Sequence, residues 1–163
     1  HEAVVRALIQ AGADISKAMD IGATPLFIAT QKGHEVVVRA LIQAGADISK
    51  AMDIGATPLF IATQKGHEVV VRALIQAGAD ISKAMDNGAT PLFIATQKGH
   101  EVVVRALIQA GADISKAMDN GETPLSIAAE NGHEVVVRAL IEAGADINNA
   151  AVNGYTALYI AAE

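Results

Sequence analysis

The sequence predicts an all-α repeat solenoid, in which helix–turn–helix units of 33 residues stack and are joined by hairpin-like loops. Two observations carry this prediction. The chain repeats with a period typical of stacked supersecondary units, and each unit contains the start and stop signals of two short helices. Residues 19–51 and 52–84 are identical, residues 85–117 differ from them only at Asn87, and residues 118–150 differ from 85–117 at eight positions.

The first helix of the unit 19–51 is predicted to begin at Pro25. Thr24 can cap it with its hydroxyl, and proline suits the first helical position. Gly33 is expected to end this helix in a left-handed conformation. A helix of about two turns is too short to be stable alone in water, so it depends on packing.

The second helix is predicted from Glu35 to Ala44. Its apolar residues recur at helical spacing and form one stripe, made of Val37, Val38, Leu41 and Ile42. Gly45 is expected to end this helix, and the Asp47 side chain can hold the turn that follows. The residues 20–22 mark the tip of a tight turn, and Asn-Gly pairs mark the same tip in later units.

Neither helix of a unit can bury its apolar stripe unless the neighbouring unit packs against it. We therefore expect one continuous solenoid over residues 1–163. Its predicted parts are a half unit at 1–18, whole units at 19–51, 52–84, 85–117 and 118–150, and a half unit at 151–163.

Composition narrows the possible functions. The hydrophobic fraction of 52% is enough for a continuous core, although aromatic residues make up only 3%. The net charge of −6 argues against nucleic acid or an anionic membrane as the main partner, and no apolar run is long enough to span a bilayer. The chain has no cysteine, so neither redox compartment is excluded. It begins with neither a signal peptide nor an initiator methionine, so targeting is left open.

The unit resembles the ankyrin repeat. The residues that carry the resemblance recur in register through the whole chain, and in the first whole unit they are Thr24-Pro25-Leu26, Ala29, Gly33-His34, Val37-Val38, Leu41-Ile42 and Gly45-Ala46-Asp47. One departure is the histidine that the family places after Thr-Pro-Leu. Here that position holds Phe27, Phe60, Phe93, Ser126 and Tyr159, so we expect more apolar packing there.

The resemblance implies a concave face that binds another protein, built from the hairpin tips and the first helices, and a cytoplasmic location. No cofactor is expected. Carried over unit by unit, the candidate protein-binding residues are Asp20, Ile21, Ala23, Gln31, Lys32, Asp53, Ile54, Ala56, Gln64, Lys65, Asp86, Asn87, Ala89, Gln97, Lys98, Asp119, Asn120, Glu122, Glu130, Asn131, Val152, Asn153 and Tyr155.

Catalytic and metal chemistry is disfavoured. The five histidines His1, His34, His67, His100 and His133 recur at the repeat period. Equivalent positions on packed helices are about 8–10 Å apart, which is too far for two nitrogens on one zinc ion. His34-Glu35 resembles the start of a zinc-protease helix, but Val38 stands where the second histidine is required. We therefore predict a structural role for the histidines and no enzymatic activity.

Two basic rows also recur, one of arginines on the second helices and one of lysines near the ends of the first helices. The acidic residues between them, and the absence of interleaved aromatic residues, favour a solvated face over a nucleic-acid site.

Two further features bear on function. Ile21 and Ile54 stand at turn tips where the backbone can need a positive φ, which is unfavourable for a β-branched residue. Two explanations of these isoleucines are open. They can make apolar contact with a partner, or they can be neutral changes at a turn position that tolerates many residues. The near identity of three successive units suits a periodic partner or self-assembly, and equally recent duplication or deliberate design.

The ends of the chain raise an alternative function. The first residues form a second helix and the last residues a first helix, and the apolar residues Val4, Val5, Leu8, Ile9, Leu158 and Ile160 are expected to face outward. Terminal units of a solenoid normally carry a polar outer face. Because of the family resemblance, the main prediction is still a non-catalytic scaffold that binds another protein. The alternatives are copies of the chain that join head to tail in a filament, and a slice of a longer array.

Overall fold

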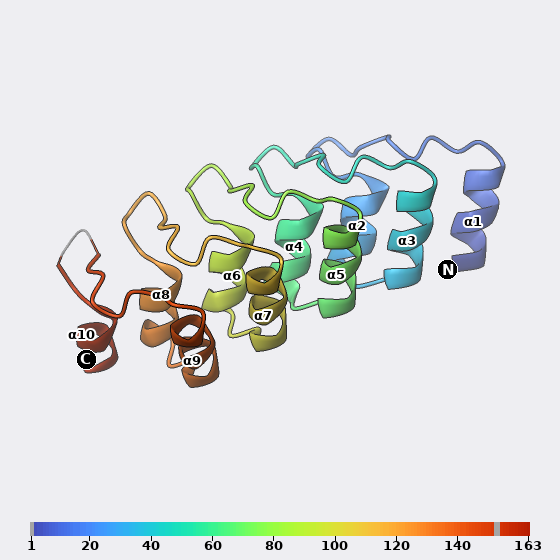
Figure 1. Cartoon of the computed structure of the whole chain (residues 1–163). Helices are drawn as coiled ribbons and strands as arrows, with labels where there is room; N and C mark the ends of the chain where they lie inside the picture. Colours follow the sequence, from blue (N-terminus) through green and yellow to red (C-terminus); the bar gives the residue numbers. More distant parts are fainter. Residues whose placement is uncertain (1, 152–153) are drawn as a thin grey trace. The chain divides into compact units, whose positions relative to one another are not determined.

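A computed structural model describes residues 2–151 and 154–163 (Figure 1); within these residues it contains ten α-helices and no β-strand. The chain forms two compact units, His1–Asp80 and Ile81–Glu163. Each is a stack of helix pairs, so the predicted all-α repeat solenoid is confirmed. The predicted division into whole and half units of one solenoid over 1–163 stays a prediction. His1, Val152 and Asn153 lie outside the described residues.

The first compact unit contains two complete helix pairs and one additional helix. Its helices are α1 (Glu2–Gln10), α2 (Pro25–Gln31), α3 (Glu35–Gln43), α4 (Pro58–Lys65) and α5 (Glu68–Gln76). Within a pair, α2 packs on α3 and α4 packs on α5. Between pairs, α2 contacts α4, α3 contacts α5, and α1 contacts α3, so like helices stack on like.

The second compact unit follows the same plan. Its helices are α6 (Pro91–Gln97), α7 (Glu101–Gln109), α8 (Pro124–Glu130), α9 (Glu134–Glu142) and α10 (Ala157–Ala161). The pairs are α6 with α7 and α8 with α9. First helices stack in the order α6, α8, α10, and α9 stacks on α7.

The predicted helix signals are confirmed in local geometry. Thr24 Oγ1 accepts a hydrogen bond of 3.2 Å from the Phe27 N–H, and Pro25 is the first residue of α2. Gly33 has a φ of +73° beyond the end of α2, as expected of a left-handed terminator. Helix α3 ends at Gln43, one residue before the predicted Ala44, which serves as its C-cap.

The hairpin tips differ from the prediction in one respect. The Gly22 N–H donates to the Met19 carbonyl and the Met19 N–H donates to the Ala23 carbonyl, both at 2.9 Å. Gly22 takes the positive φ, +80°, and among the described residues every residue with positive φ is a glycine. Ile21 therefore sits in the second central position of a turn whose φ angles are negative, which among the common types is type I. The suspected positive φ at Ile21 and Ile54 is therefore wrong, because the glycine that follows each isoleucine takes the left-handed conformation.

The core is built from the residues of the predicted stripes. Leu26, Val38 and Leu74 are fully buried. The phenylalanines that replace the family's histidine are also buried: Phe27, Phe60 and Phe93. The apolar packing expected at that position is therefore present.

We expect Leu74→Ala to lower the free energy of unfolding by about 2–5 kcal/mol, because it leaves a cavity beneath α5. Leu74 is 0% exposed, whereas Val69 on the same helix is 51% exposed. Urea unfolding followed by circular dichroism measures the difference. Val69→Ala is the control and should change stability by less than about 0.5 kcal/mol; equal midpoints for the two variants would contradict the assigned core.

Candidate functional site

The candidate surface consists of the hairpin tips and the C-terminal parts of the first helices, and we call it the tip surface. Most of the residues predicted for it have exposed or half-buried side chains in the structure. They are Asp20, Ile21, Gln31, Lys32, Asp53, Ile54, Gln64, Lys65, Asp86, Asn87, Gln97, Lys98, Asp119, Asn120, Glu122, Glu130, Asn131 and Tyr155.

Three predicted residues, all of them alanines, do not contribute in this way. The side chains of Ala23, Ala56 and Ala89 are buried, because each directly precedes the threonine that caps a first helix and lies within the core. They support the tip surface from beneath and are not available for contact with a partner. Two further candidates, Val152 and Asn153, lie outside the described residues.

Successive tips lie close together in the second compact unit. The Asp119 N–H donates to the Asn87 carbonyl at 3.4 Å. A Cβ added at Gly88 would lie 2.6 Å from Oδ1 of Asp119, so glycine is required there for the close approach as well as for its φ of +83°. The tips therefore form a packed edge.

The side chain at the tip differs between units. Asn87 Oδ1 accepts a hydrogen bond of 3.1 Å from the Ala89 N–H, and Asn120 Oδ1 does the same for Glu122. Isoleucine offers no such acceptor, and Ile21 and Ile54 are instead 53% and 56% exposed. In the first compact unit the tips therefore present apolar side chains next to aspartates, which gives this part of the surface a mixed apolar and acidic character.

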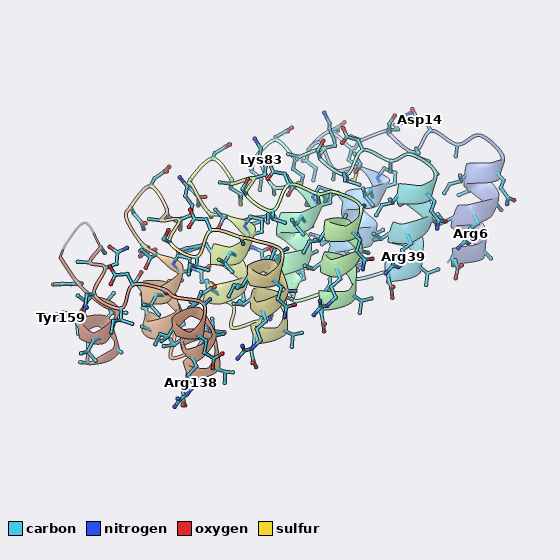
Figure 2. All side chains as sticks on the ribbon, viewed as in Figure 1. Arg6, Asp14, Arg39, Lys83, Arg138 and Tyr159 are labelled. Atoms are coloured by element: carbon cyan, nitrogen blue, oxygen red, sulfur yellow. The ribbon has the colours of Figure 1, made fainter. Side chains whose placement is uncertain are left out.

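The second helices carry a separate, charged surface. Each arginine of this row pairs with the glutamate four residues before it, as in Arg39 Nε to Glu35 Oε1 at 2.8 Å. Figure 2 labels Arg6 and Arg39 on second helices of the first compact unit and Arg138 on a second helix of the other. These pairs are exposed, so each contributes little to stability, and the row is a solvated face as expected.

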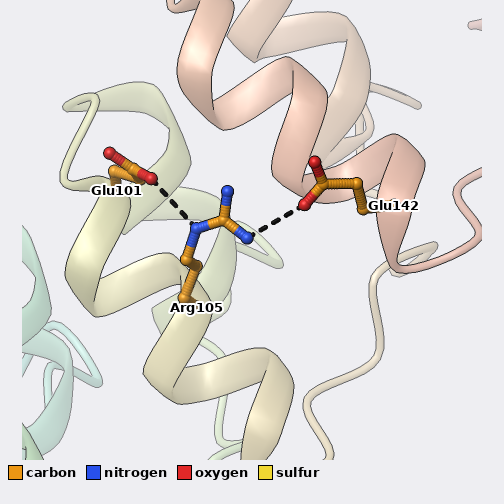
Figure 3. A network of polar contacts seen from close by, with 3 residues as sticks. All are labelled: Glu101, Arg105 and Glu142. Carbon is orange, nitrogen blue, oxygen red and sulfur yellow. Dashed lines mark hydrogen bonds and ion pairs between the residues drawn. The ribbon is translucent and has the colours of Figure 1, made fainter.

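One ion pair in this row joins two units, and it was missed from the sequence. Arg105 Nη1 on α7 lies 3.0 Å from Glu142 Oε2 on α9, while its Nε binds Glu101 (Figure 3). Glu101 and then Glu142 raise the pKa of Arg105 by hydrogen bonding to its guanidinium. The signal was the replacement of glutamine by glutamate at position 142, which is one of the eight changes in residues 118–150.

The aspartate that follows each second helix holds a turn, as predicted. Asp47 Oδ1 accepts hydrogen bonds from the Ser49 N–H at 2.8 Å and the Ser49 hydroxyl at 2.6 Å. The hydroxyl bond is the main reason that the pKa of Asp47 lies below its ordinary value, and Ser115 lowers the pKa of Asp113 in the same way. These carboxylates are structural, because their oxygens are committed to the turn.

Two histidines link successive units. The Nε2 of His67 donates to the Gln31 carbonyl at 3.1 Å, and that of His133 donates to the Gln97 carbonyl at 3.0 Å. A Cβ added at Gly33 would lie 2.9 Å from the His67 ring, so the glycine leaves space for it. These contacts give His67 and His133 a structural role.

The described residues contain no group of three or more histidine, cysteine, aspartate or glutamate side chains placed to hold a metal ion. In the same part of the chain, every helix is too short or too polar to cross a membrane.

Two models of known protein families match the sequence of this chain. A model of ankyrin repeats in three copies matches residues 49–118 and 115–163, and a model of the single ankyrin repeat matches residues 21–53. These matches cover most of the chain, which belongs to the ankyrin repeat family. Members of this family generally mediate protein–protein interaction and are generally non-catalytic. A search of curated proteins found no match.

We expect Gly33→Ala to destabilise the chain more than Gly45→Ala. Both glycines have positive φ, +73° and +91°, so both variants carry the cost of about 1–2 kcal/mol for a left-handed alanine. Only Gly33 also faces a ring, since a Cβ at Gly45 meets nothing within 4 Å. Urea unfolding measures both. In a His67→Ala background the difference should disappear; if it persists, the ring is not its cause.

Ser49→Ala is expected to raise the pKa of Asp47 toward its ordinary value of 3.8. Because the folded-state pKa is lowered, this carboxylate stabilises the fold above the unfolded pKa, and the contribution is lost as pH falls through the folded pKa. The window therefore lies below about pH 3.8, and the variant has less stability to lose there. An NMR titration of the carboxyl carbons measures the pKa. Asp113, whose own serine is intact, is the internal control; an unchanged Asp47 midpoint would contradict the assigned cause.

Proposed function

We propose that the chain is a non-catalytic scaffold that binds another protein through the tip surface. The observation that carries this proposal is the exposure of Ile21 and Ile54 at turn tips that are each closed by two backbone hydrogen bonds. Apolar side chains that are exposed on a rigid edge lose little conformational entropy when a partner covers them. The buried Ala23 and Ala56, which adjoin these tips, support that edge from beneath.

The charges around the tips give the surface its polarity. Asp20 and Asp53 are exposed beside the isoleucines, while Lys32 and Lys65 are exposed at the ends of the first helices. A partner would therefore meet an apolar and acidic edge at the tips and a basic row at the helix ends. Such arrangement of charge steers and orients a partner more than it adds affinity.

A second candidate function is self-association of the chain, head to tail. Val4 on α1 is 61% exposed and Leu158 on α10 is 79% exposed. Val70 and Leu125, which are equivalent to Val4 and Leu158, are buried. Large exposed apolar side chains of this kind mark interaction surfaces.

The scaffold proposal predicts that changes on the tip surface weaken binding without unfolding the stack. The native chain is immobilised and used to capture a binding protein, which is then identified. The Kd between that protein and this chain is measured for the native chain and for each variant. We expect Ile21→Asp combined with Ile54→Asp to raise the Kd by about tenfold or more, because contacts of this kind are worth more than about 1 kcal/mol.

Single changes Lys65→Glu and Glu122→Lys should weaken binding as well. Val69→Asp is the matched control, since Val69 is equally exposed but lies on a second helix. Circular dichroism shows that each variant is folded. If the tip variants bind as tightly as the native chain while Val69→Asp binds more weakly, the binding face is on the second helices and the proposal is wrong.

A further inference from the structure

Two rows of side chains run along the tips of the first compact unit. Each tip presents an aspartate followed by an isoleucine, Asp20-Ile21 in one and Asp53-Ile54 in the next, and all four residues are exposed. The isoleucines are 53% and 56% exposed. In each tip the aspartate and the isoleucine occupy the two central positions of the turn. The unit therefore carries an acidic row and an apolar row with the same period.

The two tips lie against each other, which fixes the period of the rows. A Cβ added at Gly22 would lie 3.1 Å from Oδ1 of Asp53 and 3.3 Å from the Cα of Met52. Each tip leads into its own first helix, and α2 packs on α4. Equivalent side chains on the two tips are therefore separated by about the distance between packed helices, roughly 8–10 Å. A ligand that contacts both tips must repeat its own side chains at this distance.

The polyproline II conformation has this repeat. It has three residues per turn and a rise of about 3.1 Å, so every third residue returns to the same edge after about 9 Å. Residues on one face of a β-strand recur after about 7 Å, which does not match. An α-helix returns to the same face after seven residues, about 10.5 Å, so only every second turn would meet a tip. Two edges of a polyproline II segment can follow both rows at once.

The charges of the surface determine the polarity of the ligand. In the described part of the chain, no ion pair involves Asp20 or Asp53. The basic residues Lys32 and Lys65 lie at the other ends of the first helices, about 10 Å along a helix of seven residues. The tips therefore attract a basic segment, and the lysines keep its charges away from the helix ends.

We propose that the tips of the first compact unit bind a basic segment of a partner protein in the polyproline II conformation. An apolar residue at every third position contacts Ile21 and Ile54. A basic residue at every third position, on the neighbouring edge, pairs with Asp20 and Asp53. The inference rests on the proposed scaffold function and names the class of its partner. Such a segment is already extended when free, so it loses little conformational entropy on binding.

The tips of the second compact unit keep the acidic row and lack the apolar one. Asp86 and Asp119 are exposed, but Asn87 and Asn120 stand in the places of the isoleucines. Each asparagine Oδ1 accepts a hydrogen bond of 3.1 Å from the backbone two residues on, so the amide is committed to its own turn. We therefore expect one binding site for the segment in each chain, on the first compact unit.

Synthetic peptides of equal composition test the spacing. One repeats Leu-Pro-Arg three times, which places the leucines on one edge and the arginines on another. The second has the same residues in an order in which no two leucines and no two arginines are three or six positions apart. Fluorescence anisotropy of the labelled peptides with the native chain measures the Kd at low salt. Both peptides carry the same charge, and we expect the Kd of the repeating one to be lower by about tenfold or more.

Variants of the chain test the two rows separately. Ile21→Asn combined with Ile54→Asn introduces the residue that the other tips already carry, so the fold is retained, and the Kd of the repeating peptide should rise by about tenfold. Asp20→Asn combined with Asp53→Asn should weaken binding and remove most of its salt dependence, because exposed charges are screened. Val69→Asn is the control, since Val69 is 51% exposed on a second helix, and it should leave the Kd unchanged.

The reverse change should create a second site. Asn87→Ile combined with Asn120→Ile gives the second compact unit the side chains of the first, beside Asp86 and Asp119. Isothermal titration calorimetry with the Leu-Pro-Arg peptide should then show two peptides bound per chain, compared with one for the native chain. Loss of folding cannot produce this gain. A stoichiometry that stays at one would contradict recognition by the isoleucine row.

The failure of this inference differs from that of the proposed function. If a captured protein binds through the tips while both peptides bind equally well, or neither binds, the scaffold proposal stands and the polyproline II partner is wrong. Tighter binding of a helical, alanine-rich peptide with leucine and arginine at seven-residue spacing would likewise assign a helix to the tips. A captured protein that binds the native chain and the tip variants equally contradicts the proposed function, and this inference is then rejected with it.

Discussion

The burial of each helix against the next pair is the interaction on which the structure depends. The described helices have five to nine residues, and helices of that length do not persist alone in water. Each one buries a stripe such as Leu26, Val38 or Leu74 against its own partner and against its neighbours in the stack. The free energy of unfolding is therefore largely the sum of the interface energies between adjacent units, and a helix face without a neighbour contributes nothing to it.

Local chemistry explains most of what could be predicted from the sequence. The cap by Thr24, the place of Pro25, the left-handed Gly33 and the serine-bound Asp47 each depend on residues within a few positions of one another. Such signals act before tertiary packing, and repetition in register multiplies them. The residues of the tip surface were inferred from the family resemblance, and the described ones are exposed or half-buried except for the three alanines.

The contacts that could not be predicted are those between adjacent repeat units, because they depend on how far apart the stacked helices lie. The contact of His67 with the Gln31 carbonyl joins residues 36 positions apart, and that of Arg105 with Glu142 joins residues 37 apart. Neither is visible until the stacking distance is known. The burial of Ala23 likewise reflects how the hairpin meets the helix that follows it. The conformation at Ile21 was misjudged, because the turn type decides whether the glycine or the residue before it takes the positive φ.

Sequence identity between units has a consequence for folding. Residues 19–51 and 52–84 offer a neighbour the same stacking surfaces. A folding chain can therefore dock a unit beyond its proper neighbour, loop out 33 residues and still bury the same side chains along that contact. The cost is the closure of one loop, which grows only slowly with loop length, and the interfaces of the omitted unit. The native register is thus selected by the number of interfaces made and not by the chemistry of any one of them, which makes misregistered states the expected kinetic traps of this chain.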